Sequence, residues 1–454
     1  MRCVVGIDLG STTTKALLLT EDGEVLGRGI TNSRSSYDVA CAVAREEALT
    51  AARFRLLERH LQGADDLCRR LKEAFRLELY LDQLGRLGEE IRALLDDPLQ
   101  REWRAALAPA VEEILGRAEA GAPDLFAAAV GGSPASAKER KSDFFRDLAG
   151  AAYVEGAEEI ATRGGVPFER LLALYDRAIL SVETRLETRD FPGLLRRAAA
   201  RLRRGAAGAL RMDRKLSEAV DAVASEPIEE LAFAGTGYGR QTLPFPKETV
   251  RSEILCHGRG AHRLFPGTRT VLDIGGQDTK AIQVDSTGVV TSFQMNDRCA
   301  AGSGRYLGYL ADELNLGLHE LGPLALRATR KVRVNSTCTV FAGAELRERL
   351  ALGETREDVL AGLHRAMMLR ALSLLARSGG IENEFTFTGG VAKNPMAVQV
   401  LGELVADNYG DGVRTNIHPD SIYTGALGAA LFALDDLAAG KAGILPTFAE
   451  EATA

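Results

Sequence analysis

The sequence VGIDLGSTTTK at residues 5–15 starts as an apolar run, ends that run at an aspartate and a glycine, and continues into hydroxyl residues and a lysine. The sequence VLDIGGQDTK at residues 271–280 repeats this plan, and the lysine follows the aspartate by seven residues in both copies. A third segment, FTFTGGVA at residues 385–392, closes another apolar run with paired glycines. We call these segments the first, second and third corners, because each pattern predicts a strand that ends in a tight turn. Two similar half-domains facing one cleft would bring all three corners around a single ligand.

The corners have the chemistry of a phosphate site. Glycines let the backbone approach phosphate oxygens, and consecutive N–H groups and Ser or Thr hydroxyls supply hydrogen-bond donors. The strand-end aspartates, Asp8 and Asp273, would be repelled by phosphate, but each could hold Mg²⁺ through water or orient an attacking water. One corner alone could equally be an ordinary turn, whereas three in this order favour a nucleotide site. The sequence contains no G-x-x-x-x-G-K-[ST], which excludes a P-loop, and residues 302–304 lack the third glycine of a dinucleotide motif.

Composition and charge exclude several classes of protein. The chain has 454 residues, of which 46% are hydrophobic and 26% charged, so it can bury a substantial core and is not globally disordered. The net charge of −7, with scattered basic residues, argues against nucleic-acid binding. No apolar run approaches the roughly 20 residues that span a bilayer, and the first residues lack the apolar region of a signal peptide. We therefore expect a cytoplasmic protein that does not enter the membrane.

Three compositional regimes follow one another along the chain. Residues 1–36 read as three strands, whereas residues 37–212 are rich in Ala, Leu, Arg and Glu at helical spacing. A Gly/Pro/Ser-rich break at residues 131–134 splits this helical region into two halves. From about residue 227 onward strands and helices alternate, which indicates an α/β fold.

Two cysteines stand in matched contexts. Cys299 and Cys338 each follow an asparagine by three residues and precede small residues and an amphipathic helix. A helix N-terminus favours a thiolate and an anionic group such as an iron–sulfur cluster. A four-iron cluster normally takes four thiolates, and the chain has no C-x-x-C, so two ligands would come from this chain and two from a partner. Buried, inert cysteines are the alternative. The remaining cysteines are scattered, at Cys3, Cys41, Cys68 and Cys256.

A possible metal site near residue 257 is the less favoured interpretation. Cys256, His257 and His262 fall in a helix-like stretch with no further pair of ligands. We therefore expect a structural use for these side chains.

The three corners resemble the phosphate-1, phosphate-2 and adenosine motifs of the actin, Hsp70 and sugar-kinase (ASKHA) superfamily. That resemblance implies an α/β fold with two ribonuclease-H-like lobes that close on ATP. Further segments resemble the BadF/BadG/BcrA/BcrD ATPase family, whose members activate 2-hydroxyacyl-CoA dehydratases or drive benzoyl-CoA reductase. These segments are residues 234–240, 294–307, 335–346 and 388–394. The resemblance covers residues 1–36 and about 213–437, and the large helical insertion is similar to that of the larger (alpha) ATPase subunit of benzoyl-CoA reductases.

The resemblance implies a domain plan and a set of site residues. The first lobe would comprise residues 1–36 and 213–265, the helical insertion 37–212, the second lobe 266–440, and a C-terminal tail 441–454. Compact activators of the family pass almost directly from the third strand to the first core helix, which the resemblance places here at residues 214–224. The ATP-binding residues implied are Gly10, Ser11, Thr12, Thr13, Lys15, Gly275, Gly276, Gln277, Asp278, Gly389 and Gly390. Asp273 would position water or bind Mg²⁺, and Asp8 would hold Mg²⁺ through water, although these two roles could be exchanged. Cys299 and Cys338 would ligate a 4Fe-4S cluster shared with a partner subunit.

The function implied is that of an ATP-hydrolysing electron-transfer subunit. Ferredoxin would reduce the shared cluster, and ATP hydrolysis would drive the electron to acyl-CoA-binding reductase subunits. We expect the partner to be a smaller paralogous ATPase subunit, although a self-contained helical insertion would also permit a homodimer. Two alternatives stay open: a homodimeric activator of a 2-hydroxyacyl-CoA dehydratase, and a small-molecule kinase of the same fold. The kinase would need a substrate-facing carboxylate and no cluster.

Overall fold

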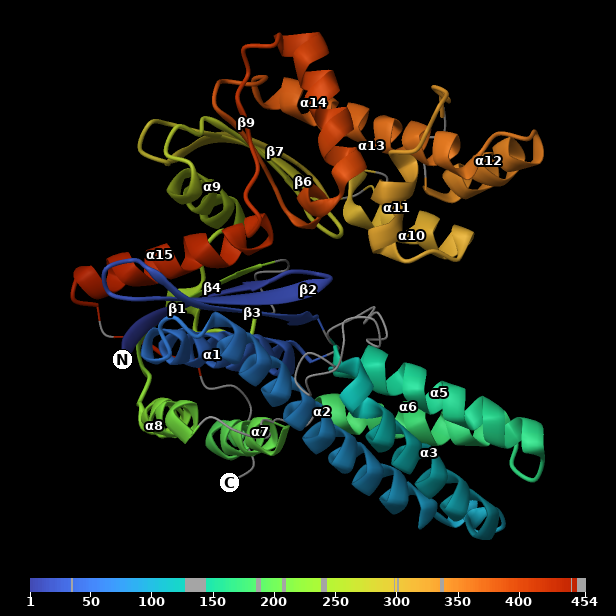
Figure 1. Ribbon diagram of the computed structural model, residues 1–454. Coiled ribbons are helices and arrows are strands. Elements are labelled where there is room, and N and C mark those ends of the chain that lie inside the picture. The colour runs from blue at the N-terminus through green and yellow to red at the C-terminus, as the bar shows by residue number, and fades with distance from the viewer. Residues whose placement is uncertain are drawn as a thin grey trace. The chain divides into compact units, whose positions relative to one another are not determined.

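The computed structural model divides the chain into two compact units (Figure 1). One, the helical unit, is built on residues 49–228, and the other, the two-sheet unit, comprises residues 2–48 and 229–448. The structure describes residues 1–33, 36–126, 144–184, 189–205, 210–237, 243–297, 299, 302–334, 339–441 and 443–446.

The first sheet of the two-sheet unit is built mainly from the N-terminal residues. Its strands are β1 (Arg2–Leu9), β2 (Thr13–Leu19), β3 (Val25–Asn32) and β4 (Glu229–Gly237). Their order is β3-β2-β1-β4, with β1 antiparallel to β2 and parallel to β4. The three strands predicted within residues 1–36 are therefore confirmed.

The second sheet repeats this plan. Its strands are β5 (Thr270–Ile274), β6 (Thr279–Val284), β7 (Val290–Asn296), β8 (Phe385–Thr388) and β9 (Thr415–Asn416). Their order is β7-β6-β5-β8-β9, and β5 is again antiparallel to the next strand and parallel to β8. The strand-end aspartate faces the following lysine in both sheets, as Asp8 opposite Lys15 and Asp273 opposite Lys280. The repeat seen in the sequence is therefore a repeat of structure.

Two helices occupy the layer between these sheets. They are α9 (Glu253–Leu264) and α15 (Thr424–Ala438), which pack on each other (Figure 1). Cys256 of α9 belongs to the core shared by α15 and the first sheet, whereas Ile254 and Ala261 pack on the second sheet. Helix α9 is thus held from both sides, which fixes the side chains at its N-terminus.

Five helices and the second sheet enclose the largest core of the two-sheet unit. They are α10 (Gly304–Leu314), α11 (Leu318–Ala325), α12 (Thr339–Ala351), α13 (Arg356–Ser378) and α14 (Pro395–Tyr409). Among the described helices, α13 alone is long and apolar enough to cross a membrane. Its apolar window is 61% buried inside the protein, as expected for a core helix, so this is weak evidence for a membrane span.

The helical unit buries its apolar stripes within itself. Its helices are α2 (Asp65–Leu95), α3 (Arg104–Leu125), α5 (Phe145–Arg163), α6 (Phe168–Thr184), α7 (Phe191–Gly205) and α8 (Leu210–Ser225), joined by the second half of α1 (Tyr37–His60). Helices α2, α3, α5 and α6 enclose one core, and α1, α2, α7 and α8 enclose another.

The unit overlaps the predicted insertion without coinciding with it. Helix α1 begins in the two-sheet unit, where Ala44 and Ala48 lie close to Gly29 of β3. Helix α8, expected to be the first core helix of the α/β region, instead packs its Leu216 and Val220 in the helical unit. The predicted break at residues 131–134 lies outside the described residues.

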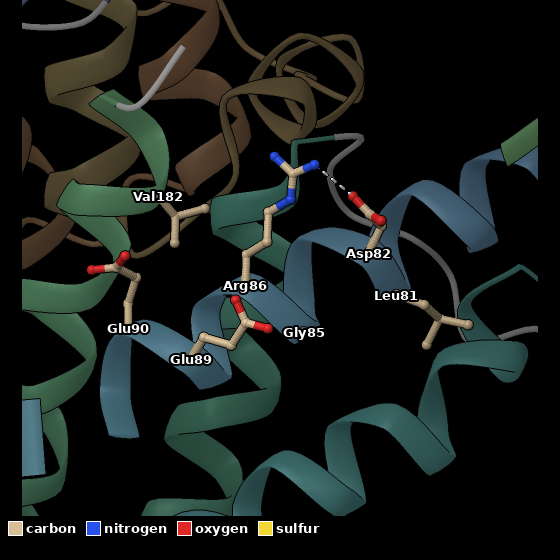
Figure 2. Close-up of a pocket in the computed structure, with 7 residues that line it drawn as sticks. All are labelled: Leu81, Asp82, Gly85, Arg86, Glu89, Glu90 and Val182. Atoms are coloured by element: carbon tan, nitrogen blue, oxygen red, sulfur yellow. Dashed lines mark ion pairs between the residues drawn. The ribbon is translucent and has the colours of Figure 1, made fainter. Parts of the chain in front are cut away.

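The helical unit also contains a pocket of about 420 Å³ between α2 and α6, far in sequence from the corners (Figure 2). Its lining is mostly polar and consists of Leu81, Asp82, Gly85, Arg86, Glu89, Glu90 and Val182. Arg86 pairs with Asp82 at 3.1 Å, and Ser181 donates a hydrogen bond to Glu90 at 2.8 Å. Its carboxylates make it a poor site for an anionic nucleotide.

Helices α9 and α15 cross closely, so replacing glycine by alanine should change the stability of the protein in opposite directions at two helical positions. A Cβ atom on Gly428 of α15 would lie 1.9 Å from the carbonyl oxygen of Cys256, whereas Gly402 of α14 faces open space. Gly428→Ala should destabilise the protein by about 1–3 kcal/mol or more through overpacking. Gly402→Ala should stabilise it by roughly 0.5–1 kcal/mol, because alanine is the better helix former. Thermal unfolding measures both, and equal stability of the two variants would contradict the crossing.

Candidate active site

The three corners meet in the two-sheet unit. A Cβ atom on Gly276 of the second corner would lie 2.1 Å from Thr12 Oγ1 of the first. A Cβ atom on Gly389 of the third corner would lie 2.3 Å from the carbonyl oxygen of Ile274, at the end of β5. Gly389 has φ of +87°, a conformation that favours glycine at this turn. The fold is therefore consistent with the prediction that the three corners lie around a single ligand site.

Asp273 lies at the centre of a buried polar network. Its Oδ1 accepts a hydrogen bond from Thr388 Oγ1 of β8 at 2.8 Å. His257 Nδ1 lies 3.2 Å from the same oxygen, an ion-pair distance at which the angles fall short of a hydrogen bond. Burial alone would raise the pKa of Asp273, but the charges of His257 and Lys280 outweigh it and hold the pKa well below its usual range. The carboxylate is therefore ionised and anchored from β6, α9 and β8.

Lys280 is surrounded by three carboxylates. Its Nζ lies 2.8 Å from Asp278 Oδ2, 3.1 Å from Glu253 Oε1 and 3.5 Å from Asp273 Oδ2. Burial would lower the pKa of Lys280, but these neighbours raise it, so the ammonium stays charged. With its three donors facing these partners, Lys280 has a structural role.

The equivalent lysine of the first corner is much less engaged. Lys15 Nζ lies 3.5 Å from Asp8 Oδ2, and its side chain is partly exposed. An ammonium whose one partner among the described residues is this distant carboxylate keeps donors for an incoming phosphate. The sequence showed two identical Asp–Lys spacings, and only the structure separates a structural lysine from an available one.

Asp8, Glu253 and His257 form a second cluster beside this network. One ligand atom from each lies within 4.8 Å of the others, and Asp8 Oδ1 is buried without a hydrogen-bond partner among the described residues. A buried carboxylate oxygen without a partner is costly, and a Mg²⁺ ion or its water would satisfy it. Mg²⁺ prefers oxygen ligands, so Asp8 and Glu253 fit this ion.

His257 and Gly425 complete the cluster. Burial would lower the pKa of His257, but the Asp273 carboxylate raises it, so the imidazolium can donate hydrogen bonds from both nitrogens. A Cβ atom on Gly425, at the start of α15, would lie 2.8 Å from Asp8 Oδ2 and 2.9 Å from His257 Nε2. Only glycine leaves the space between these two groups open.

Glu253 and His257 were missed by the sequence analysis, which expected His257 to be structural. Their spacing of four residues places both on one face of α9, and this was the available signal. The signal was weak because their partners lie elsewhere in sequence, on β1, β5 and β6. The remaining predicted residues lie where the corners place them: Gly10, Ser11, Thr12 and Thr13 at the turn into β2, Gly275, Gly276, Gln277 and Asp278 between β5 and β6, and Gly389 and Gly390 after β8.

The loop after β7 carries Cys299. Its thiol is partly exposed and accepts a hydrogen bond from Arg370 Nη1 at 3.4 Å, while Asn296 Nδ2 donates to its carbonyl oxygen at 3.1 Å. Helix α10 begins five residues later, at Gly304. Cys338 lies outside the described residues, directly before the first residue of α12.

The other four cysteines are poorly suited to bind a cluster. Cys3, Cys41, Cys68 and Cys256 are all buried in strands or helices. Burial raises the pKa of the Cys3 and Cys256 thiols to about 12, which keeps them protonated. The chain can therefore offer Cys299 and Cys338 at most, a donor set that fits a cluster completed by a partner.

Three hydrogen bonds join Gly302 and the start of α10, which follow Cys299 in the chain, to the second corner. The backbone N–H of Gly304 donates to the carbonyl oxygen of Gly275 at 2.8 Å, and that of Arg305 donates to Gly276 at 2.7 Å. The Thr279 hydroxyl donates to the carbonyl oxygen of Gly302. The start of α10 and the second corner are therefore one hydrogen-bonded piece of structure.

The model of the BadF/BadG/BcrA/BcrD ATPase family matches residues 5–433. The chain belongs to this family. The activating ATPase of (R)-2-hydroxyglutaryl-CoA dehydratase from Acidaminococcus fermentans is 43% identical over 206 residues, which are 45% of this chain and 76% of that protein. One of the subunits of benzoyl-CoA reductase from Thauera aromatica is 36% identical over 199 residues, which are 44% of this chain and 70% of that protein.

The fold expected for this ATPase family member is also confirmed. The crystal structure of component A of the Acidaminococcus fermentans dehydratase superposes with a TM-score of 0.53 at 23% identity, covering 96% of this chain and 100% of that one. At this identity the likeness shows the fold alone. It is the two-lobed α/β fold of actin, Hsp70 and the sugar kinases, and the two repeated sheets are its lobes.

The network around Asp273 predicts the effect of removing one charge. Asp273→Asn should slow ATP hydrolysis by several powers of ten, because His257 and Lys280 lose the carboxylate that positions them. Asp285→Asn is the matched control, since Asp285 lies in an exposed turn where it accepts hydrogen bonds from the Thr287 and Val289 N–H groups. Phosphate release measures both rates. Wild-type turnover in Asp273→Asn would remove this residue from the mechanism.

Proposed function

We propose that this chain is the ATP-hydrolysing electron-transfer subunit of a benzoyl-CoA reductase. The observation that carries the proposal is the hydrogen-bonded link between the second corner and the Cys299 loop. Any movement of Gly275 and Gly276 on nucleotide binding or hydrolysis would be transmitted to the start of α10. A protein that only bound ATP would not need a partly exposed cysteine next to the segment that its second corner holds.

The nucleotide would bind at the three corners. Backbone N–H groups and the hydroxyls of Ser11, Thr12 and Thr13 would donate to phosphate oxygens, and Lys15 would add a positive charge. Gly389 and Gly390 would lie by the adenosine.

The strand-end aspartates would bind Mg²⁺ and position the attacking water. Asp8, with its unpartnered oxygen, is the better candidate to hold Mg²⁺ through water. Asp273 would position the attacking water through the groups that it orders, above all His257.

Cys299 and Cys338 would hold one half of a 4Fe-4S cluster. The cluster would supply a low-potential one-electron store. The helices that follow the two cysteines, α10 and α12, would add the positive ends of their dipoles near its anionic charge. Two further thiolates would come from a smaller paralogous ATPase subunit.

The electron donor and acceptor complete the proposal. Ferredoxin would donate the electron, and subunits that bind the acyl-CoA would accept it, all in the cytoplasm. Reduction of an aromatic ring by single electrons is energetically difficult, which gives coupling to ATP hydrolysis its purpose. The likeness to the benzoyl-CoA reductase protein of Thauera aromatica and the large helical unit support this assignment.

A second candidate is the activator of a 2-hydroxyacyl-CoA dehydratase. The higher identity to the dehydratase activating ATPase, 43% against 36% for the reductase protein, favours it. Both candidates share the ATPase site and the cysteine pair, and they differ in the acyl-CoA enzyme that receives the electron. Membership of the ATPase family disfavours the small-molecule kinase alternative.

The cluster assignment predicts the outcome of single cysteine substitutions. Cys299→Ser and Cys338→Ser should each lose iron, because a shared cluster deprived of one thiolate is no longer fully ligated. Nucleotide binding should persist, since the corners do not depend on either thiol. Cys68→Ser, in the helical unit, is the control and should keep its iron. Iron and sulfide analysis after anaerobic purification tests this, and full iron content in both ligand variants would refute the assignment.

The partner assignment predicts the composition of the native assembly. One helical unit per cluster-bearing dimer could contact the electron-accepting subunits and leave the other side to the donor. Native mass spectrometry of the anaerobically purified complex should therefore find this chain with a smaller ATPase chain and acyl-CoA-binding subunits. A functional, cluster-bearing dimer made only of copies of this chain would favour the homodimeric activator instead.

A further inference from the structure

Arg370 places a positive charge against the sulfur of Cys299. It lies on α13, 71 positions along the chain from that cysteine, and its Nη1 donates to Sγ at 3.4 Å. Among the described residues, no carboxylate forms an ion pair with Arg370. A hydrogen bond from a charged donor is stronger and more directional than one from a neutral donor.

The backbone that carries Arg370 is firmly held. The neighbouring Met367, Met368 and Ala371 are buried in the core under the second sheet. Six residues before Arg370, His364 Nδ1 lies 2.8 Å from the carbonyl oxygen of Leu360 and therefore donates to it. The other ring nitrogen then accepts from Asn394 Nδ2 at 3.1 Å.

Asn394 connects this helix to the third corner. It follows Gly389 and Gly390 and caps the N-terminus of α14, where its side chain accepts from the Ala397 N–H at 3.0 Å. Burial lowers the pKa of His364 to about 4, so the ring stays neutral and keeps this bonding pattern. Helix α13 therefore cannot easily slide or rotate, so the backbone from which Arg370 reaches the sulfur is fixed.

We infer that Arg370 is a positioning residue that sets the reduction potential of the iron–sulfur centre bound through Cys299. The inference rests on the proposed function. Reduction by one electron from a ferredoxin-type donor adds one negative charge to the centre, and no bond forms or breaks. A fixed cation that donates to a ligand sulfur stabilises the more negative, reduced state, so Arg370 raises the potential. It brings the centre within reach of its donor.

The test is a redox titration of the complete, anaerobically purified protein. The electron paramagnetic resonance signal of the reduced centre is measured at each potential. Arg370→Gln should shift the midpoint potential to a more negative value. Arg370→Lys, which keeps the charge but loses the planar fork, should shift it less. Arg365→Gln is the matched control, because Arg365 lies on the same helix and pairs with Glu403 at 3.9 Å, and its potential should equal that of the wild type.

The outcomes separate this inference from the proposed function. Absence of iron from the wild-type protein would refute the proposed function. If all variants keep their iron and the midpoint potential of Arg370→Gln equals that of the wild type or of Arg365→Gln, the inference is refuted and the proposed function is not affected. If Arg370→Gln loses its iron, Arg370→Lys carries the test. Loss of iron from both would show that Arg370 holds the centre without setting its potential, which also overturns the inference.

Discussion

The buried charge of Asp273 is the constraint on which the site depends. An ionised carboxylate that is 1% exposed is tolerated only when charged and hydrogen-bonding groups surround it. Those groups come from three places: Lys280 on β6, His257 on α9 and Thr388 on β8. The contacts that this one carboxylate requires therefore hold three elements in place: the second corner, the end of β8, and α9. Helix α9 in turn presents Glu253 next to Asp8.

The two lobes share a plan, but their chemistry differs. In the second lobe the aspartate and its lysine are enclosed by partners, whereas in the first Asp8 keeps an unpartnered oxygen among the described residues and Lys15 has one distant partner. Such a division suits a nucleotide site, in which one strand end provides a rigid frame and the other offers ligands. The same frame extends through Gly275 and Gly276 to the start of α10, and so toward Cys299.

The features that were predicted correctly are those that a short stretch of sequence determines. The corners and their strands follow from apolar runs that end in turn residues, over about ten residues each. The spacing of each aspartate and lysine was visible in the sequence, but only the strand pairing shows that they face each other. Glu253, His257 and Arg370 were missed, because each acts on a residue distant in sequence, and only packing of α9 and α13 brings them together. The boundaries of the helical unit differed for a related reason. Helix α1 runs continuously out of the two-sheet unit, and the apolar face of α8 packs in the helical unit.

The proposed coupling requires the second corner and the Cys299 loop to move as one piece. The most direct measurement is the midpoint potential of the iron–sulfur centre in the wild-type complex, titrated with ADP and then with a non-hydrolysable ATP analogue. Two different potentials are expected, because a shift of Gly275 and Gly276 would move the start of α10, to which both are hydrogen-bonded, and with it the preceding segment that carries Cys299. Identical potentials and identical spectra in the two nucleotide states would contradict it.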